Sequence, residues 1–134
     1  MDRLTELASQ FSREPLVSLL NARLDGLKDG EAAVSAPASD EVLIVTGIVQ
    51  GGIIAAVADY AGVYAAMTRV AAGHTPAMHI GIHFFRPVRK GETITARARV
   101  ENENRSTIMT LVDVYGDDGK RKAHASILFA RPKP

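Results

Sequence analysis

Residues 51–67 read GGIIAAVADYAGVYAAM, and this stretch decides the fold. Its side chains are apolar or small apart from two tyrosines and Asp59, so the pattern predicts a buried helix. A membrane span is the alternative. Crossing a bilayer takes roughly 20 apolar residues, and Asp59 interrupts this shorter run near its middle. We therefore predict a central helix over residues 50–71 that the rest of the chain encloses.

The sequence changes to a period-two alternation after Gly73, which is typical of strands with one face in the core. Turn-forming residues separate four such runs, at residues 78–85, 92–102, 106–115 and 120–130. Antiparallel hairpins are expected to join them.

Two short helical stretches and a hairpin are predicted before the central helix. Residues 1–22 carry apolar side chains at helical spacing, and Pro15 is acceptable in a first helical turn. Asp-Gly pairs mark turns around residues 23–28 and 31–36, which we predict to be an antiparallel pair. A β-branched run predicts an extended segment at residues 42–45. The expected class is α+β, with an antiparallel sheet of five or six strands wrapped around one long buried helix.

Length and composition exclude several classes of protein and several kinds of site. The 134 residues fit a single domain, residues 1–134, and 46% hydrophobic with 23% charged residues is ordinary for a globular protein. The absence of cysteine excludes a disulfide scaffold, a thiolate zinc site and a cysteine nucleophile. A net charge of +1 provides no general field for nucleic acid. The N-terminus lacks the pattern of a secretory signal, so we expect a cytoplasmic protein without membrane contact.

Asp59 is the only residue of the predicted central helix between Gly51 and Met67 that carries a charge at neutral pH. Burial raises the proton affinity of a carboxylate, which suits it to act as general base or nucleophile. A carboxylate satisfied by a local partner, or placed at a subunit contact, is the alternative interpretation.

The residues Gln50, Gly51 and Gly52 precede this helix. Free N–H groups at a helix start stabilise an anion, and glycines allow a carbonyl oxygen to approach closely, as an oxyanion hole requires. A simple turn into the helix is the alternative. Gly51 and Asp59 lie eight residues apart, which is about 12 Å along a helix. One reacting carbonyl cannot contact both, so a shared reaction requires Gly51 of one subunit to face Asp59 of another.

His79 and His83 raise the question of a metal. Four residues along a strand span about 13 Å, which one ion cannot bridge, so no metal is expected from this pair. The two histidines are expected to line a cleft or an interface. Basic residues gather near the strand ends and can form either a solvated rim or a phosphate-binding rim: Arg86, Arg89, Lys90, Arg105, Lys120, Arg121 and Lys122.

Three motifs in order resemble the hotdog-fold acyl-CoA thioesterases of the phenylacetate-degradation and 4-hydroxybenzoyl-CoA type. They are the turn at residues 47–52, Asp59 seven positions after Gly52, and the strand end Phe84-Phe85-Arg86-Pro87. The resemblance covers about residues 15–130 and implies a hydrolase of acyl-CoA without a cofactor. It implies that Asp59 is the base or nucleophile, that the Gly51 N–H polarises the thioester carbonyl, and that Gln50 stands at the family's histidine position.

The resemblance further implies a homodimer or homotetramer, with substrate between subunits. The expected substrate-binding residues are Gly52, Thr75, Ala77, His79, Arg86, Arg89 and Lys90. The sequence departs from the family at three positions. Gln50 replaces the histidine, Ile44 replaces an Asn or Gln, and Ala77 replaces a Ser or Thr unless Thr75 serves instead. A non-catalytic acyl-CoA-binding protein of the same fold is the alternative function, and a purely structural oligomer is a third.

Overall fold

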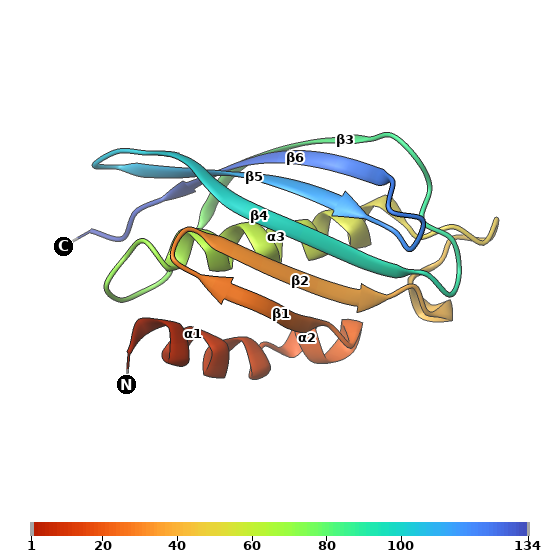
Figure 1. Ribbon diagram of the computed structural model, residues 1–134, viewed down its shortest axis with the longest axis horizontal. Coiled ribbons are helices and arrows are strands. Elements are labelled where there is room, and N and C mark those ends of the chain that lie inside the picture. Colours follow the sequence, from red (N-terminus) through yellow and green to blue (C-terminus); the bar gives the residue numbers. More distant parts are fainter. Residues whose placement is uncertain (1, 134) are drawn as a thin grey trace.

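The computed structural model describes residues 2–133, and its central feature is a curved antiparallel sheet (Figure 1). The six strands lie in the order β1-β2-β4-β5-β6-β3, and all neighbours are antiparallel. Their bounds are β1 Arg23–Lys28, β2 Glu31–Pro37, β3 Ala77–Phe84, β4 Thr93–Glu103, β5 Thr107–Tyr115 and β6 Arg121–Ala130. The predicted strands are confirmed, with ends displaced by one or two residues.

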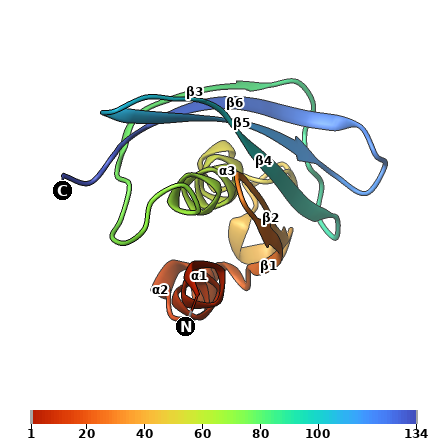
Figure 2. The ribbon, with the colours of Figure 1, turned by 60° about the vertical axis from the view of Figure 1, so that its left-hand side comes forward.

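The long helix α3 (Gly51–Met67) lies in the concave side of this sheet (Figure 2). The inward-facing residues of β4, β5 and β6 are fully buried against it; examples are Val112, Ile127 and Phe129. Gly62 lets the helix approach closely, because a Cβ there would lie 2.9 Å from Thr110 Oγ1 and 3.0 Å from the Ile127 Cδ1. The α+β class and the wrapped helix predicted from the sequence are thereby confirmed.

Two short helices, α1 (Arg3–Ser12) and α2 (Pro15–Leu20), form a further layer at the β1 end of the molecule (Figure 2). Asp2 caps α1 by accepting a hydrogen bond from the Thr5 N–H at 2.8 Å. Phe11 of α1 meets the rings of Tyr60 and Tyr64 edge-on, with centroids 5.9 and 5.1 Å apart. α1 therefore covers part of α3 that the sheet leaves open.

Three predictions about the middle of the chain were wrong in detail. The central helix was expected over 50–71, but it ends at Met67, and the backbone turns at Gly73, where φ is 86°. The expected extended segment at 42–45 begins in a 3-10 turn, Asp40–Val42, and only Leu43 pairs, with Val49. The helix is also not enclosed on every side, since residues 51–53, 55, 56, 59 and 60 stay partly exposed, while Ile54, Val57 and Ala58 are buried. Because this helix is apolar on all sides, its sequence gives no signal for which side the sheet leaves open.

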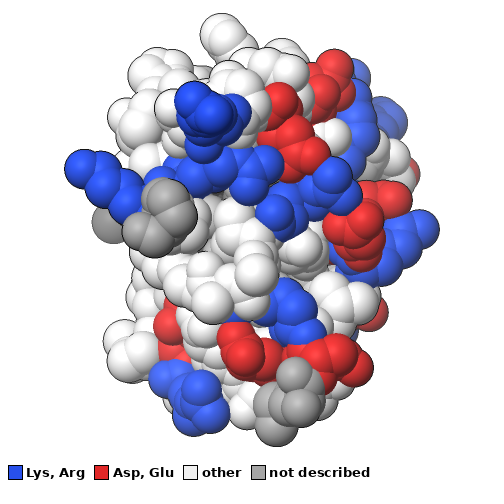
Figure 3. Space-filling model, turned by 90° about the vertical axis from the view of Figure 1, so that its left-hand side faces the viewer, with Lys and Arg blue, Asp and Glu red and all other residues white. Residues whose placement is uncertain are grey.

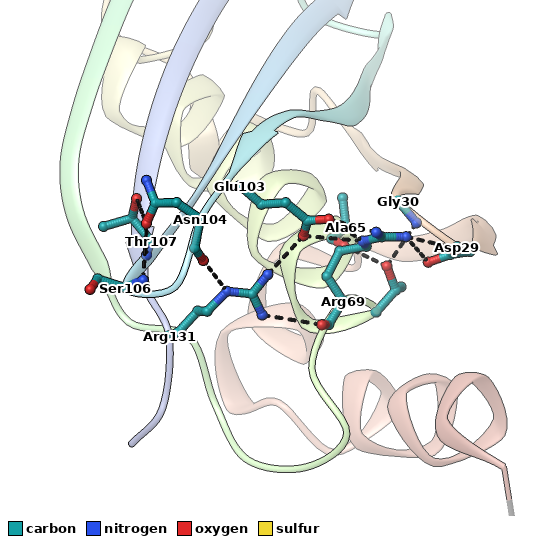
Figure 4. Close-up of polar contacts among 10 residues, drawn as sticks. Asp29, Gly30, Ala65, Arg69, Glu103, Asn104, Ser106, Thr107 and Arg131 are labelled. Atoms are coloured by element: carbon teal, nitrogen blue, oxygen red, sulfur yellow. Dashed lines mark hydrogen bonds and ion pairs between the residues drawn. The ribbon is translucent and has the colours of Figure 1, made fainter. Parts of the chain in front are cut away.

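Charged side chains gather at the C-terminal end of α3, on the face shown in Figure 3. Arg69 pairs with Asp29 of the β1–β2 turn at 2.8 Å and with Glu103 at the end of β4. Arg131 donates to the Oε2 of Glu103 at 2.9 Å, an oxygen that also accepts from the Arg69 Nε at 3.2 Å (Figure 4). These contacts join four segments that are distant in the sequence.

Candidate active site

The start of α3 offers free backbone donors. Gln50 is its N-cap, and the side-chain Oε1 accepts a hydrogen bond from the Ile53 N–H at 3.1 Å. The first N–H groups of a helix have no partner inside the helix, and the Gln50 side chain occupies only that of Ile53. The N–H groups of Gly51 and Gly52 therefore remain available to an anion at the positive end of the helix.

Gly51 and Gly52 each leave room for a different neighbouring side chain. A Cβ on Gly52 would lie 2.7 Å from the Gln50 Oε1, so glycine leaves room for the capping side chain to fold back. A Cβ on Gly51 would lie 3.3 Å from the ring of Phe84, the last residue of β3. Phe84 thus packs against the helix start and shields it from one side. This contact gives Phe84, at the end of the strand, a role beside Gly51 that the sequence alone did not predict.

Backbone pairing holds the segment after β3 beside the helix start. Ile48 pairs with Arg89, and the Val49 N–H donates to the Val88 carbonyl at 2.8 Å. Arg89 and Lys90 therefore lie next to the turn that leads into α3. The Lys90 ammonium contacts Asp40 at 3.0 Å on the exposed surface.

Asp59 lies two turns further along α3. Its Oδ1 is buried and has no hydrogen-bond partner within the described chain. Burial raises the pKa of this carboxyl, and the charge of His74 partly offsets the shift by lowering it. A buried carboxylate oxygen without a partner destabilises the fold, so its presence calls for an explanation from function or assembly.

Gly51 and Asp59 lie on the same straight helix, about 12 Å apart by its rise per residue. One chain therefore does not bring both groups to one carbonyl. One surface hollow, of about 650 Å³, is lined by Asp29, Arg69 and Glu103, at the opposite end of α3 from Gly51.

The edge strand β3 is the least covered strand of the sheet. Met78, Ile80 and Phe84 are 56%, 40% and 50% exposed, which is unusual for apolar strand residues. β3 pairs with β6 on one side, and its other edge is free in the described chain. A free, apolar edge strand is a template for pairing with another strand.

The remaining predicted substrate residues lie at different places. Thr75 is fully buried and its hydroxyl has no partner in the described chain, whereas Ala77 is exposed at the start of β3. His79 lies on the sheet face opposite to α3, because its strand neighbour Ile80 pairs with the core residue Ile127. The structure does not bring His79 to the helix start.

The basic rim is only partly solvated. Lys122, expected among exposed basic residues, is buried and contacts Asp118 at 3.0 Å. Arg86 donates to the Arg121 carbonyl at 3.1 Å, and the Arg121 guanidinium lies over the Phe85 ring, 5.1 Å from its centre. Arg86 therefore braces the end of β3 against β6.

Comparison with known proteins identifies the family. The model of the thioesterase superfamily matches residues 46–123, which include the turn at 47–52, Asp59 and the strand end at Arg86. This chain belongs to the thioesterase superfamily. Its six-stranded sheet around one helix is the hotdog fold of that superfamily. None of the described helices is long and apolar enough to span a membrane.

Solved structures agree with this assignment. A mutant of the phenylacetic acid degradation protein PaaI from Thermus thermophilus is 30% identical, with a TM-score of 0.83, and the match covers 89% of this chain and all of that one. The TT0310 protein of the same organism is 31% identical, with a TM-score of 0.84, covering 90% and 99% of the two chains. The PaaI protein of E. coli matches at a TM-score of 0.88 and 22% identity, over 97% and 96% of the chains, and supports the fold.

Proposed function

We propose that this protein is an acyl-CoA thioesterase whose active site forms between two copies of the chain. The observation that carries the proposal is the buried, unpartnered oxygen of Asp59 on the same helix as the free N–H of Gly51. The superfamily assignment supports hydrolysis of a thioester as the reaction.

In this proposal the Gly51 N–H and the Asp59 carboxylate have different roles in the hydrolysis. The Gly51 N–H donates to the thioester carbonyl oxygen and stabilises the negative charge that develops there. The raised pKa of Asp59 favours uptake of a proton at this carboxylate, so it serves as general base for an attacking water. The carbonyl carbon gains a C–O bond, the C–S bond breaks, and the products are the free acid and coenzyme A. If Asp59 attacks the carbonyl itself, an acyl-enzyme anhydride forms first and water then hydrolyses it.

Gln50 has a supporting role in this scheme. Its Oε1 is engaged by the Ile53 N–H, while its amide N–H2 is free to donate. An amide cannot carry a proton at neutral pH, so Gln50 is a positioning residue at the helix start. Asp59 is then the group that moves the proton.

The free edge of β3 supports the two-chain arrangement. Pairing of two β3 strands around a two-fold axis extends the sheet and covers the exposed Met78 and Ile80. Such a dimer places two copies of α3 side by side, and the partly exposed first half of the helix then faces its counterpart. Arg86, Arg89 and Lys90 lie near the helix start and are the proposed contacts for the phosphates of coenzyme A.

The experiment measures thiol release from short-chain, long-chain and aromatic acyl-CoA substrates. Arylacetyl-CoA belongs in the panel because structural neighbours are named for phenylacetic acid degradation. Asp59→Asn is expected to reduce kcat at least a hundredfold on whichever substrate is turned over, since loss of a positioned base costs roughly 10²–10⁴ in rate. Asp25→Asn, an exposed carboxylate on β1, is the matched control and retains the wild-type rate. Equal rates for wild type and Asp59→Asn would contradict the proposal.

A non-catalytic acyl-CoA-binding protein is the second candidate. Ile44 is 41% exposed near the helix start and has no polar group to orient water, and Ala77 adds none. This candidate predicts thermal stabilisation by acyl-CoA without release of thiol. The same substrate panel separates the two functions.

A further inference from the structure

A row of polar side chains crosses the outer face of the sheet, away from α3. The β3–β6 register places His83 directly opposite His124, and the β5–β6 register places Asp113 directly opposite His124. The residues that flank this row along the strands, such as Ala123 and Ala125, are fully buried on the inner face. Because strand side chains alternate, His83, His124 and Asp113 share the outer face.

Asp113 orients the His124 ring through a hydrogen bond with one of its two nitrogens. The Nδ1 of His124 lies 2.8 Å from the Asp113 Oδ1. Burial acts to raise the pKa of Asp113, but hydrogen bonds from His124 and Arg121 together hold this pKa below its usual value. An ionised carboxylate can only accept, so Nδ1 donates to Asp113 and Nε2 is the ring nitrogen that is left to bind a ligand. A histidine that donates one ring N–H to a carboxylate is the arrangement that orients imidazole ligands in metal sites.

His83 supplies a second imidazole on the same face. Directly opposite residues in an antiparallel pair have Cβ atoms about 4.5–5.5 Å apart, so both rings can direct a nitrogen to one point above the sheet. His83 is exposed and free to select the rotamer that does so. Here the two histidines lie on adjacent strands, whereas His79 and His83 lie about 13 Å apart along one strand.

We propose that His83 and His124 form a surface binding site for a divalent transition-metal ion, with Asp113 orienting His124. Imidazole ligands suit Zn²⁺, Ni²⁺ and Cu²⁺ and disfavour Mg²⁺ and Ca²⁺. Within residues 2–133 no group of three or more His, Cys, Asp or Glu side chains is placed to hold an ion, so water completes the coordination. The neighbouring cations Arg121, 3.1 Å from Asp113, and Arg97, opposite Asp113, weaken binding by repulsion.

The site is separate from the proposed thioesterase chemistry. It lies on the outer face of the sheet, whereas Asp59 and Gly51 belong to the helix on the inner side. Its side chains project from the sheet face rather than from the edge of β3, so pairing of that edge with another strand leaves them accessible. The proposal therefore does not depend on the function proposed above.

Calorimetric titration of the tag-free protein with Zn²⁺, Ni²⁺ and Cu²⁺ tests the site. One ion per chain is expected, with Cu²⁺ bound most tightly in accordance with the usual order of divalent metals. His83→Ala and His124→Ala are each expected to weaken binding at least tenfold, and Asp113→Asn by roughly 10–100-fold, as for other carboxylates that orient a ligand histidine.

His74→Ala is the matched control, because His74 is an exposed histidine on the loop after α3. It is expected to bind each ion as the wild type does. Retained wild-type affinity in His83→Ala would overturn the proposal, as would an equal loss in His74→Ala. Thermal unfolding without metal shows whether each variant is folded, and the exposed His83 provides a test that does not disturb the core.

Discussion

The Asp59 carboxylate combines two physical properties that oppose each other. Burial makes it a better proton acceptor, and burial also makes its ionised form destabilising. Because the folded pKa is raised, the folded protein holds this proton at a pH where the unfolded chain has released it. Stability is therefore lost as pH rises from about 3.8 through the folded pKa.

Asp59→Asn should accordingly be more stable than the wild type at neutral pH, by about 1–3 kcal/mol, while it loses activity. The difference between the two proteins should shrink as pH falls through the folded pKa, because the wild-type carboxyl is then neutral as well. Urea unfolding at a series of pH values measures this difference in the free energy of unfolding. A variant that is less stable than wild type at pH 7 would show that a partner satisfies the carboxylate in the assembled protein.

At the scale of elements, the two ends of α3 differ in the contacts that they make. The N-terminal end carries Gln50, Gly51 and the contact with Phe84, and the C-terminal end is fastened by Arg69. Thr68 adds to this fastening, since its hydroxyl accepts a hydrogen bond from the Gly30 N–H at 2.8 Å and donates one to the Ala65 carbonyl at 2.6 Å. These contacts hold the C-terminal end of the helix against the sheet, and the proposed oxyanion donor lies at its other end.

The Arg69–Glu103–Arg131 contacts should contribute measurably to stability. Hydrogen bonding from Arg69 is the main cause that lowers the pKa of Glu103, so its stabilisation is present above pH about 4.5 and is lost as pH falls through the lower folded pKa. Glu103→Gln is expected to cost about 1 kcal/mol at pH 7, and less in acid. Unfolding of Glu101→Gln, an exposed glutamate on the same strand, serves for comparison and should match the wild type.

At the scale of the molecule, the distance between Gly51 and Asp59 predicts complementation between chains. Gly51→Pro deletes the N–H, and proline suits a first helical position because Gln50 already has an extended ψ of 134°. When the Gly51→Pro and Asp59→Asn chains are mixed, unfolded and refolded together, they form heterodimers. One of the two sites in each heterodimer then combines an unchanged Gly51 with an unchanged Asp59. Random pairing then restores about a quarter of wild-type activity per chain.

Gly51→Ala is the control for this mixture, because it keeps the N–H while adding a Cβ against Phe84. If each site lay within one chain, the mixture of Gly51→Pro and Asp59→Asn would stay inactive. Sedimentation of the refolded mixture shows whether the heterodimers have formed.

The sequence predicted the strands closely, because alternation of apolar residues reports directly which face of a strand is buried. The same signal failed at residues 42–45, where a β-branched run lies in a turn and only Leu43 joins a bridge. It also failed at Lys122, because local composition does not reveal that this lysine is buried and pairs with Asp118. Asp59 and the glycine pair were recognisable since a charge within an apolar helix and glycines at its start are both local features.

By itself, the sequence determined the elements of this protein, its family motifs and the carboxylate that stands in an apolar helix, because all of these are written in spacing along the chain. Only the tertiary structure decided that Asp59 Oδ1 has no partner within residues 2–133, that Phe84 covers Gly51, and that His83 lies opposite His124. These facts depend on strand register and on helix placement. Both are set by packing between residues far apart in the sequence, which no local pattern records.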